Sequence, residues 1–301
     1  MKHVISGARR RLLLRAGAAV PLAALAGGCA FDADFDHNDA EAPNAAPLRI
    51  PVRTAWVFSS GGPRGFVHVG VIKALDELRL APDLIVGASV GAMVGTLRAA
   101  GMPAKIMETL ALELSPTTFA RLALGARERL SGSALADWVQ DKIGHRMLER
   151  LPTPIVCVAL RLRDRAIVPF TAGNAGVAVQ ASAAIEGRFA PVRIRGERYA
   201  DPDWVRPLPV REARAFGAQR VVAIDASAHE NRAPSGAQAY REDDLRKRAL
   251  IRPDAAAADL VLHPDFGYWV SLSRAFRERA IDAGYRAAMA EAPRLIALHR
   301  T

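Results

Sequence analysis

The chain has 301 residues, of which half are hydrophobic and 24% are charged. This length and composition support a sizeable buried core and exclude a disordered chain, a fibre and a disulfide scaffold. The formal charge is +10, but the sequence shows neither zinc-finger spacing nor a basic helix with interleaved aromatic residues. We therefore expect a soluble globular protein that binds no nucleic acid, with an arginine-rich surface facing water or anionic lipid headgroups.

The N-terminus has the order of an export signal. Three consecutive arginines begin at residue 9, and three leucines and an apolar stretch rich in small residues follow them. The tetrapeptide Ala26-Gly27-Gly28-Cys29 resembles a bacterial lipobox, in which the cysteine becomes the acylated first residue of the mature protein. We predict an export signal over residues 1–28 and lipidation of Cys29; the alternative is an ordinary cleaved signal with an incidental cysteine.

The segment that follows is acidic. Between residues 30 and 48 the chain carries no lysine or arginine, and its acidic residues are Asp32, Asp34, Asp36, Asp39 and Glu41. Such a segment, which also contains proline, is expected to stay extended and solvated. We therefore predict that residues 29–51 tether a domain at residues 52–301 to the surface of a bacterial membrane, on the exported side.

From residue 52 onward, short apolar runs alternate with segments of helical periodicity. This alternation predicts an α/β domain in which helices cover both faces of a sheet. The predicted strands cover residues 55–59, 84–86, 155–160, 221–225 and 260–262. The predicted helices cover residues 65–80, 90–100, 103–114, 133–143, 173–185, 208–216 and 271–299.

Two further segments carry separate predictions. Residues 229–258, rich in alanine, arginine, aspartate and proline, are predicted to form a mobile or lid-like insertion, with an ordinary surface excursion as the alternative. Cys157 lies in an apolar run, residues 154–160. We expect it to be a buried structural thiol rather than a nucleophile.

A Gly-x-Ser-x-Gly sequence joins the second predicted strand to the helix after it. It reads Gly87-Ala88-Ser89-Val90-Gly91, and a serine in this strand-to-helix setting is typical of a nucleophile elbow. The flanking glycines allow a tight turn that lifts the hydroxyl clear of the sheet edge, and the helix N-terminus adds partial positive charge. The alternative is that Ser89 only caps the helix.

A second glycine-rich loop follows the first predicted strand. It reads Gly61-Gly62-Pro63-Arg64-Gly65 and opens another helix. Backbone N–H groups in such a loop stabilise an oxyanion during acyl transfer. The loop lacks the Gly-Lys-Ser/Thr of a Walker motif and the spacing of a dinucleotide site, so a simple phosphate cradle is the alternative.

Together the two glycine loops resemble the patatin-like phospholipase family. Residues 61–71 resemble its oxyanion segment, residues 87–91 its nucleophile elbow, and residues 199–210 the segment that presents a catalytic aspartate. The resemblance extends over residues 54–227. It implies a three-layer α/β/α sandwich with a mostly parallel central sheet, and hydrolysis of lipid acyl esters.

The resemblance also implies which residues carry the chemistry. Ser89 attacks the ester and Asp201 takes its proton directly, without histidine, metal or cofactor, so that an acyl-enzyme forms and is then hydrolysed. The implied oxyanion donors are the backbone N–H groups of Gly62 and Arg64. Because an ordinary aspartate is a weak base at neutral pH, the carboxylate must be buried against the hydroxyl.

The aspartate segment departs from the family pattern. Where the family usually has Asp-Gly-Gly or Asp-Gly-Ala, this chain reads Asp201-Pro202-Asp203, and Arg206 replaces a frequent asparagine. Proline restricts the backbone of Asp201 and bears on where its carboxylate points. The neighbouring charge of Asp203 is expected to raise the pKa of Asp201.

Two alternatives to an active dyad stay open, the first because of this departure and the second because of the chain order serine, acid, histidine. One is a membrane-tethered protein that keeps an acyl-lipid pocket but has lost turnover. The other is an esterase of the α/β-hydrolase type, in which Ser89 and Asp201 work with His229 or His263. We expect His68, on the helix after the glycine loop, to pack locally.

Overall fold

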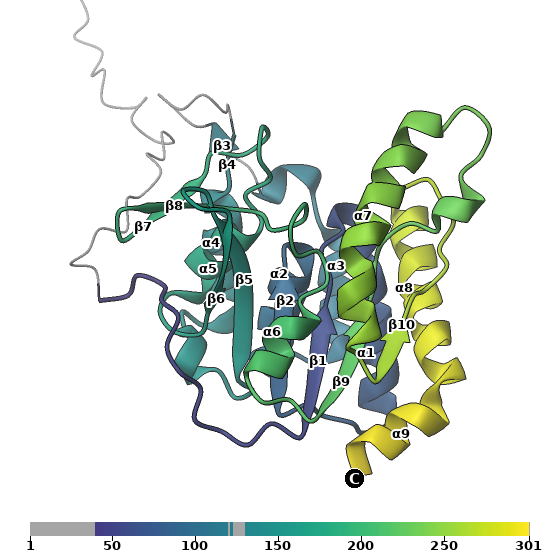
Figure 1. The fold of residues 1–301 in the computed structure, drawn as a ribbon, viewed down its shortest axis with the longest axis horizontal. Helices are drawn as coiled ribbons and strands as arrows, with labels where there is room; N and C mark the ends of the chain where they lie inside the picture. Colours follow the sequence, from purple (N-terminus) through teal and green to yellow (C-terminus); the bar gives the residue numbers. More distant parts are fainter. Residues whose placement is uncertain (1–39, 120, 123–129, 301) are drawn as a thin grey trace, which may run out of the picture.

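A computed structural model describes residues 40–119, 121–122 and 130–300 (Figure 1). The predicted export signal over residues 1–28 and the predicted lipidation site Cys29 lie outside these residues. The described chain folds around one central β-sheet, with a separate two-stranded sheet near one end.

Five parallel strands form the centre of the sheet and confirm the five strands that the sequence predicts. They are β1 (Thr54–Phe58), β2 (Leu84–Ala88), β5 (Ile155–Arg161), β9 (Arg220–Ile224) and β10 (Leu260–Leu262). Their order across the sheet is β10, β9, β1, β2 and β5. Side chains alternate between the faces, so that Trp56 and Phe58 enter one core and Ala55 and Val57 the other.

Three antiparallel strands extend the sheet beyond β5, and the sequence did not predict them. They are β6 (Ala166–Phe170), β7 (Val192–Ile194) and β8 (Glu197–Ala200); β6 and β8 both pair with β5, and β7 pairs with β8. Strands β7 and β8 are very short and contain charged residues, and β6, although apolar, is partly exposed and contains a proline, which is unfavourable inside a strand. This edge of the sheet delivers residue 201 to the site.

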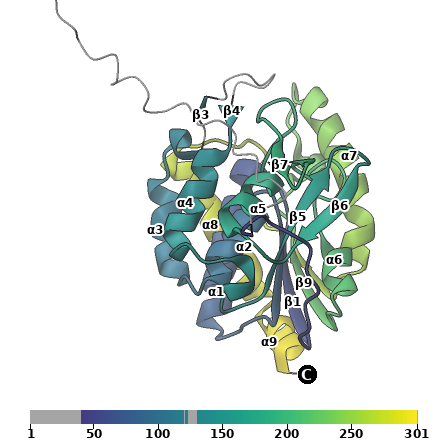
Figure 2. The ribbon, with the colours of Figure 1, turned by 90° about the vertical axis from the view of Figure 1, so that its left-hand side faces the viewer.

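Helices cover both faces, which confirms the three-layer α/β/α fold (Figure 2). One layer packs on the core that contains Trp56 and Phe58. Its helices are α1 (Phe66–Glu77), α2 (Val90–Ala99), α3 (Ala104–Glu113), α4 (Ser133–Ile143), α5 (Ala175–Ser182) and α8 (Arg274–Ala290). On the opposite face lie α6 (Val210–Ala215) and α7 (Gln238–Ala256), whose Val210, Ala213 and Ile251 enter the second core.

The backbones of α1 and α8 approach each other closely. A Cβ on Gly70 would overlap the carbonyl oxygen of Ile281, and a Cβ on Gly284 would overlap the carbonyl oxygen of Val67. Only glycine permits this contact at either position. This contact fixes α1, the helix that begins directly after the glycine-rich loop at residues 61–65.

The predicted insertion over residues 229–258 is wrong for most of its length. Residues 238–256 form α7, in which Ile251 and Asp254 are fully buried and Lys247 is nearly so. The segment escaped recognition because its buried positions include the charged residues Lys247 and Asp254, which form ion pairs with Asp203 and Arg211 outside the helix instead of an apolar stripe. The predicted final helix over 271–299 is divided near Glu291 into α8 and α9 (Ala292–Arg300).

The described part of the predicted tether is docked on the domain. Ala42 is fully buried, and the Asn44 N–H donates to the carbonyl oxygen of Ala172 at 3.0 Å. The Thr171 hydroxyl donates to the carbonyl oxygen of Ala46 at 2.6 Å. A free tether as far as residue 51 is therefore wrong for this stretch, because its backbone pairs with the loop before α5. In the described residues, no helix combines the length and hydropathy needed to span a membrane.

Candidate active site

Ser89 lies in a strained turn between β2 and α2. Its φ of 55° and ψ of −122° place a non-glycine residue in a rarely occupied backbone region. A Cβ on Gly87 would overlap the carbonyl oxygen of Gly91, and a Cβ on Gly91 would overlap that of Phe58. The two glycines therefore leave space that the turn needs, and the Ser89 side chain makes no capping hydrogen bond to α2.

A buried serine on α5 holds this turn in place. The Ser89 N–H donates to the Ser182 hydroxyl oxygen at 2.8 Å, and that hydroxyl donates to the carbonyl oxygen of Val158 at 2.6 Å. Ser182 thus connects the nucleophile turn to strand β5. The sequence placed Ser182 in the predicted helix over residues 173–185, but it gave no signal of this contact with residue 89.

The strand register brings Ser89 and Asp201 together. Strand β2 ends with Ala88 beside Val158, and β8 ends with Ala200 beside Leu160. Strand β6 occupies the other edge of β5, so β2 and β8 lie along the same edge and run toward each other. The residue after each strand therefore reaches the same position, beside Ala159. There the Ser89 hydroxyl donates to Oδ2 of Asp201 at 2.5 Å.

The segment Asp201-Pro202-Asp203 does not turn the carboxylate away. The Asp201 N–H donates to the carbonyl oxygen of Ala184 at 2.9 Å, which fixes the backbone before the proline. The Asp203 N–H donates to Oδ1 of Asp201 at 2.9 Å. Both carboxylate oxygens of Asp201 are therefore engaged, one by the nucleophile and one by the backbone.

Burial sets the charge state of Asp201. Loss of hydration, reinforced by the negative charge of Asp203, raises the pKa of the Asp201 carboxyl to about 7. The hydrogen bonds from Ser89 and from the Asp203 backbone act in the opposite direction, as does the positive charge of Lys247. The carboxyl group is thereby converted from a very weak base into one suited to neutral pH.

Asp203 is itself held by two groups that the sequence analysis missed. The Lys247 ammonium group, on α7, lies 2.5 Å from Oδ1 of Asp203, and the Ser60 hydroxyl donates to the same oxygen. Lys247 is buried, so this ion pair is shielded from solvent. Because 44 residues separate the partners and α7 was not predicted, no local pattern indicated the pair.

The glycine-rich loop lies against the nucleophile turn. A Cβ on Gly65 would overlap the Val90 side chain, which places this end of the loop beside α2. Gly62 has a φ of 54° and begins a short 3₁₀ helix, so its N–H lies outside that helix's hydrogen bonds. The Arg64 N–H instead donates to the carbonyl oxygen of Gly61 at 3.1 Å and closes the turn. Pro63 has no N–H to offer.

None of the three singled-out histidines bonds to the pair. The rings of His229 and His263 stack on each other with centroids 3.8 Å apart, and His263 Nε2 lies 3.0 Å from the carbonyl oxygen of Ser227. His68 is buried, its Nε2 lies 2.9 Å from the carbonyl oxygen of Ser59, and burial lowers its pKa to about 4. The expected local packing of His68 is confirmed.

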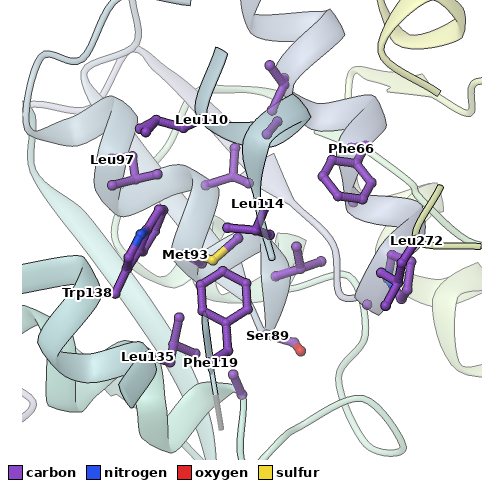
Figure 3. A pocket seen from close by; sticks show the side chains of 18 of the residues that line it. Phe66, Ser89, Met93, Leu97, Leu110, Leu114, Phe119, Leu135, Trp138 and Leu272 are labelled. Atoms are coloured by element: carbon purple, nitrogen blue, oxygen red, sulfur yellow. The ribbon is translucent and has the colours of Figure 1, made fainter. Parts of the chain in front are cut away.

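An apolar cavity of about 350 Å³ opens beside the serine (Figure 3). Its wall includes residues of α1, α2, α3, α4, α8 and the chain before α8, and Figure 3 shows Ser89 at its edge with the oxygen visible. The large apolar side chains around it include Phe66, Met93, Leu97, Leu110, Leu114, Phe119, Leu135 and Trp138. The cavity's size and lining suit a hydrocarbon chain.

Two further features concern other chemistry. Within the described ranges, no group of three or more His, Cys, Asp or Glu side chains is arranged to hold a metal ion. Cys157 is buried in β5, where burial raises the pKa of its thiol to about 12. The prediction of a structural rather than nucleophilic thiol is consistent with this environment.

Comparison with known proteins gives the same family as the glycine loops. An uncharacterized NTE family protein of Mycobacterium tuberculosis, Rv1063c, is 34% identical over 195 residues, which are 62% of this chain and 54% of that protein. The lysophospholipase NTE1 of Saccharomyces cerevisiae is 27% identical over 59% of this chain, but over only 11% of its own length. The chain therefore spans about half of the mycobacterial relatives that it matches.

The fold has a counterpart among solved structures. The crystal structure of VipD from Legionella pneumophila superposes with a TM-score of 0.53 at 16% identity, over 86% of this chain and 71% of VipD. The family model for patatin-like phospholipases matches residues 56–214, more than half of the chain and the part that contains both glycine loops and Asp201. The chain belongs to the patatin-like phospholipase family.

Proposed function

We propose that this protein is a lipid acyl hydrolase that cleaves carboxylic esters through a Ser89–Asp201 dyad. The observation that carries the proposal is the 2.5 Å hydrogen bond from the Ser89 hydroxyl to Asp201 beside an apolar cavity. Membership of the patatin-like phospholipase family supports a lipid substrate. The strained turn, the buried base and the apolar cavity are the parts that ester hydrolysis of a lipid needs.

The proposed reaction has two halves. Asp201 takes the hydroxyl proton as Ser89 attacks the ester carbonyl, and the Gly62 N–H and the first N–H of α2 face the oxyanion that forms. The alcohol leaves with the proton held by Asp201, which produces an acyl-enzyme on Ser89. Water then attacks the acyl group while Asp201 takes a water proton, and Ser89 regains its proton as the fatty acid leaves.

The geometry favours this dyad over both alternatives. A serine-histidine triad requires an imidazole against the serine, whereas His229 and His263 stack on each other and His263 Nε2 lies against the carbonyl oxygen of Ser227. Loss of turnover was expected if Pro202 turned the Asp201 carboxylate away from Ser89. The carboxylate instead accepts a hydrogen bond from the Ser89 hydroxyl. The lysophospholipase name of the yeast relative makes single-chain phospholipids the first substrates to test.

Hydrolysis of a lysophospholipid in mixed micelles tests the proposal. We expect Ser89→Ala and Asp201→Asn each to lower kcat by at least about a thousandfold, as loss of a nucleophile or its base does in serine hydrolases. A His229→Ala/His263→Ala double variant is the matched control and keeps most of the activity. Loss of turnover in the double variant as well as in Asp201→Asn would support the triad instead.

We also propose that an acylated Cys29 holds the protein on the exported face of a bacterial membrane. The support is the sequence order of residues 1–29 alone. Cys29→Ser is expected to abolish incorporation of labelled palmitate and to move the protein into the soluble fraction. Unchanged labelling and fractionation would exclude this anchor.

A further inference from the structure

Arg277 brings a positive charge to the wall of the apolar cavity. It lies on α8, is only 5% exposed and lines the same cavity as Ser89. Its guanidinium carbon lies 5.5 Å from the centre of the Phe66 ring. A buried arginine among apolar side chains is uncommon unless an anion accompanies it.

The protein satisfies only part of this guanidinium. Nη1 donates to the carbonyl oxygens of Ala111 and Leu112 at 3.1 Å each, at the end of α3. The Nε atom is buried without a hydrogen-bond partner, and within the described residues neither Nε nor Nη2 bonds to another group. No carboxylate in that part of the chain pairs with Arg277. The partial negative charge of a helix end compensates a full charge only in part.

The edge of the guanidinium formed by Nε and Nη2 has the geometry needed to bind a phosphate or a carboxylate. Nε and Nη2 present parallel N–H groups, which match two oxygens of a phosphate or a carboxylate. Such a pair forms charge-assisted hydrogen bonds, and these are strong where water is excluded.

Arg277 also lies on the side of the cavity where a headgroup would be placed. Leu272, on the same approach to α8, lines the cavity and is 45% exposed, which marks the opening to solvent. Figure 3 shows Leu272, Phe66 and Ser89 along one side, with Leu97 and Trp138 across the cavity. An acyl chain directed toward Leu97 therefore leaves the rest of the lipid near the opening.

We propose that Arg277 binds an oxyanion of the lipid substrate or of its product; if it binds the substrate's phosphate, it selects phosphate-bearing esters over neutral ones. The inference rests on the proposed hydrolase function for the identity of the ligand. The oxyanion comes either from the headgroup phosphate of the substrate or from the carboxylate of the released fatty acid. The two sources differ in which ligand loses affinity when Arg277 is replaced.

The test compares Arg277→Gln and Arg277→Lys with Arg279→Gln. Arg279 is the matched control because it lies on the same helix, donates to the carbonyl oxygen of Phe266 and lies over an aromatic ring, but does not line the cavity. Each variant is assayed with lysophosphatidylcholine and with monoacylglycerol of the same chain length. Free fatty acid serves as a product inhibitor.

For a phosphate ligand, Arg277→Gln raises KM for lysophosphatidylcholine about tenfold or more. In that case kcat/KM for monoacylglycerol changes less than about twofold, and Arg277→Lys is intermediate because it keeps the charge but loses the planar fork. For a carboxylate ligand, the inhibition constant of the fatty acid rises instead. Equal losses with both esters would show that Arg277 only stabilises α3, and no change with any ligand would overturn the proposal.

A binding measurement separates this proposal from the hydrolase proposal. Trp138 lines the cavity, so its fluorescence reports ligand entry in Ser89→Ala, which cannot turn over. We expect Ser89→Ala/Arg277→Gln to bind lysophosphatidylcholine or fatty acid at least about tenfold more weakly than Ser89→Ala does, with unchanged binding of monoacylglycerol. Equal affinities in the two backgrounds would overturn the role of Arg277, whether or not the wild-type protein hydrolyses lipids.

Discussion

Ser89 combines backbone strain with a short hydrogen bond to a buried base. Its backbone conformation costs on the order of 1–3 kcal/mol, which the surrounding contacts must offset. The Ser182 hydroxyl is one such contact, because it accepts the Ser89 N–H that no helix or strand satisfies. The reactive residue is therefore positioned from two sides, by Asp201 through its hydroxyl and by Ser182 through its backbone.

Ser182→Ala tests this positioning. The change leaves the Ser89 N–H buried without a partner, so we expect the protein to lose about 1–3 kcal/mol of stability. We also expect kcat to fall while KM changes little, since the cavity is untouched. Urea unfolding and steady-state kinetics measure the two effects. Ser133→Ala is the control, because the Ser133 hydroxyl has no hydrogen-bond partner among the residues that the structure describes. Equal effects in both variants would contradict the role of Ser182.

The charges around Asp201 predict opposite shifts in the pH profile of kcat/KM. The base is active when deprotonated, so activity rises with pH through a pKa of about 7. Asp203→Asn removes a neighbouring negative charge and moves this rise to lower pH. Lys247→Met removes the positive charge and moves it to higher pH. Shifts in the same direction, or none, would show that these two residues do not set the basicity of Asp201.

At the scale of whole elements, α7 links the second helical layer to the site. Its buried Ile251 packs into the core beneath the sheet, while Lys247 reaches Asp203. A helix anchored in this way differs from a mobile lid, which has few buried apolar contacts. The position of the base therefore depends on an element that supplies no residue to the reaction itself.

Substitutions within α7 measure how firmly it is packed. Ile251→Ala is expected to lower the free energy of unfolding by about 2–5 kcal/mol, as for other buried aliphatic side chains. Leu245→Ala, on the same helix but 41% exposed, changes it by less than about 0.5 kcal/mol. If both substitutions change the free energy of unfolding by equally small amounts, α7 is loosely packed, as the prediction of a mobile insertion implied.

What the sequence predicts about these elements follows from where each one is buried. The five parallel strands were predictable because both their faces are covered, which requires continuous apolar residues. Strands β7 and β8 were not, since they are short and carry charged residues, and β6 was not, since it is partly exposed and contains Pro169. The encounter of Ser89 with Asp201 was expected from family resemblance. The contacts of Ser182, Lys247 and Arg277 depend on three-dimensional register and carry no local pattern.

At the scale of the whole molecule, the raised pKa of Asp201 lowers the stability of the folded protein at neutral and higher pH. Burial raises the pKa of Asp201 above its ordinary value, so between about pH 4 and pH 7 the folded protein holds a proton that the unfolded chain has released. The contribution of Asp201 to stability is therefore present at low pH and is lost as pH rises through this window. Above it, the folded state retains a desolvated negative charge.

Asp201→Asn is expected to reveal this cost. Asparagine still accepts a hydrogen bond from Ser89 but carries no charge at any pH. The free energy of unfolding of the variant minus that of wild type should therefore be larger at pH 8 than at pH 5. Urea unfolding of both proteins at the two pH values measures the difference. A constant difference would mean that Asp201 is not strongly desolvated in the folded protein.

The account as a whole depends on a serine that aspartate activates without histidine. Mass spectrometry after treatment with a fluorophosphonate probe, which reacts with activated serines, tests this most directly. We predict an adduct on the peptide containing Ser89 in wild type and in the His229→Ala/His263→Ala variant, and its loss in Asp201→Asn. Labelling that vanishes in the histidine variant, labelling that persists in Asp201→Asn, or an adduct on another serine would contradict the dyad.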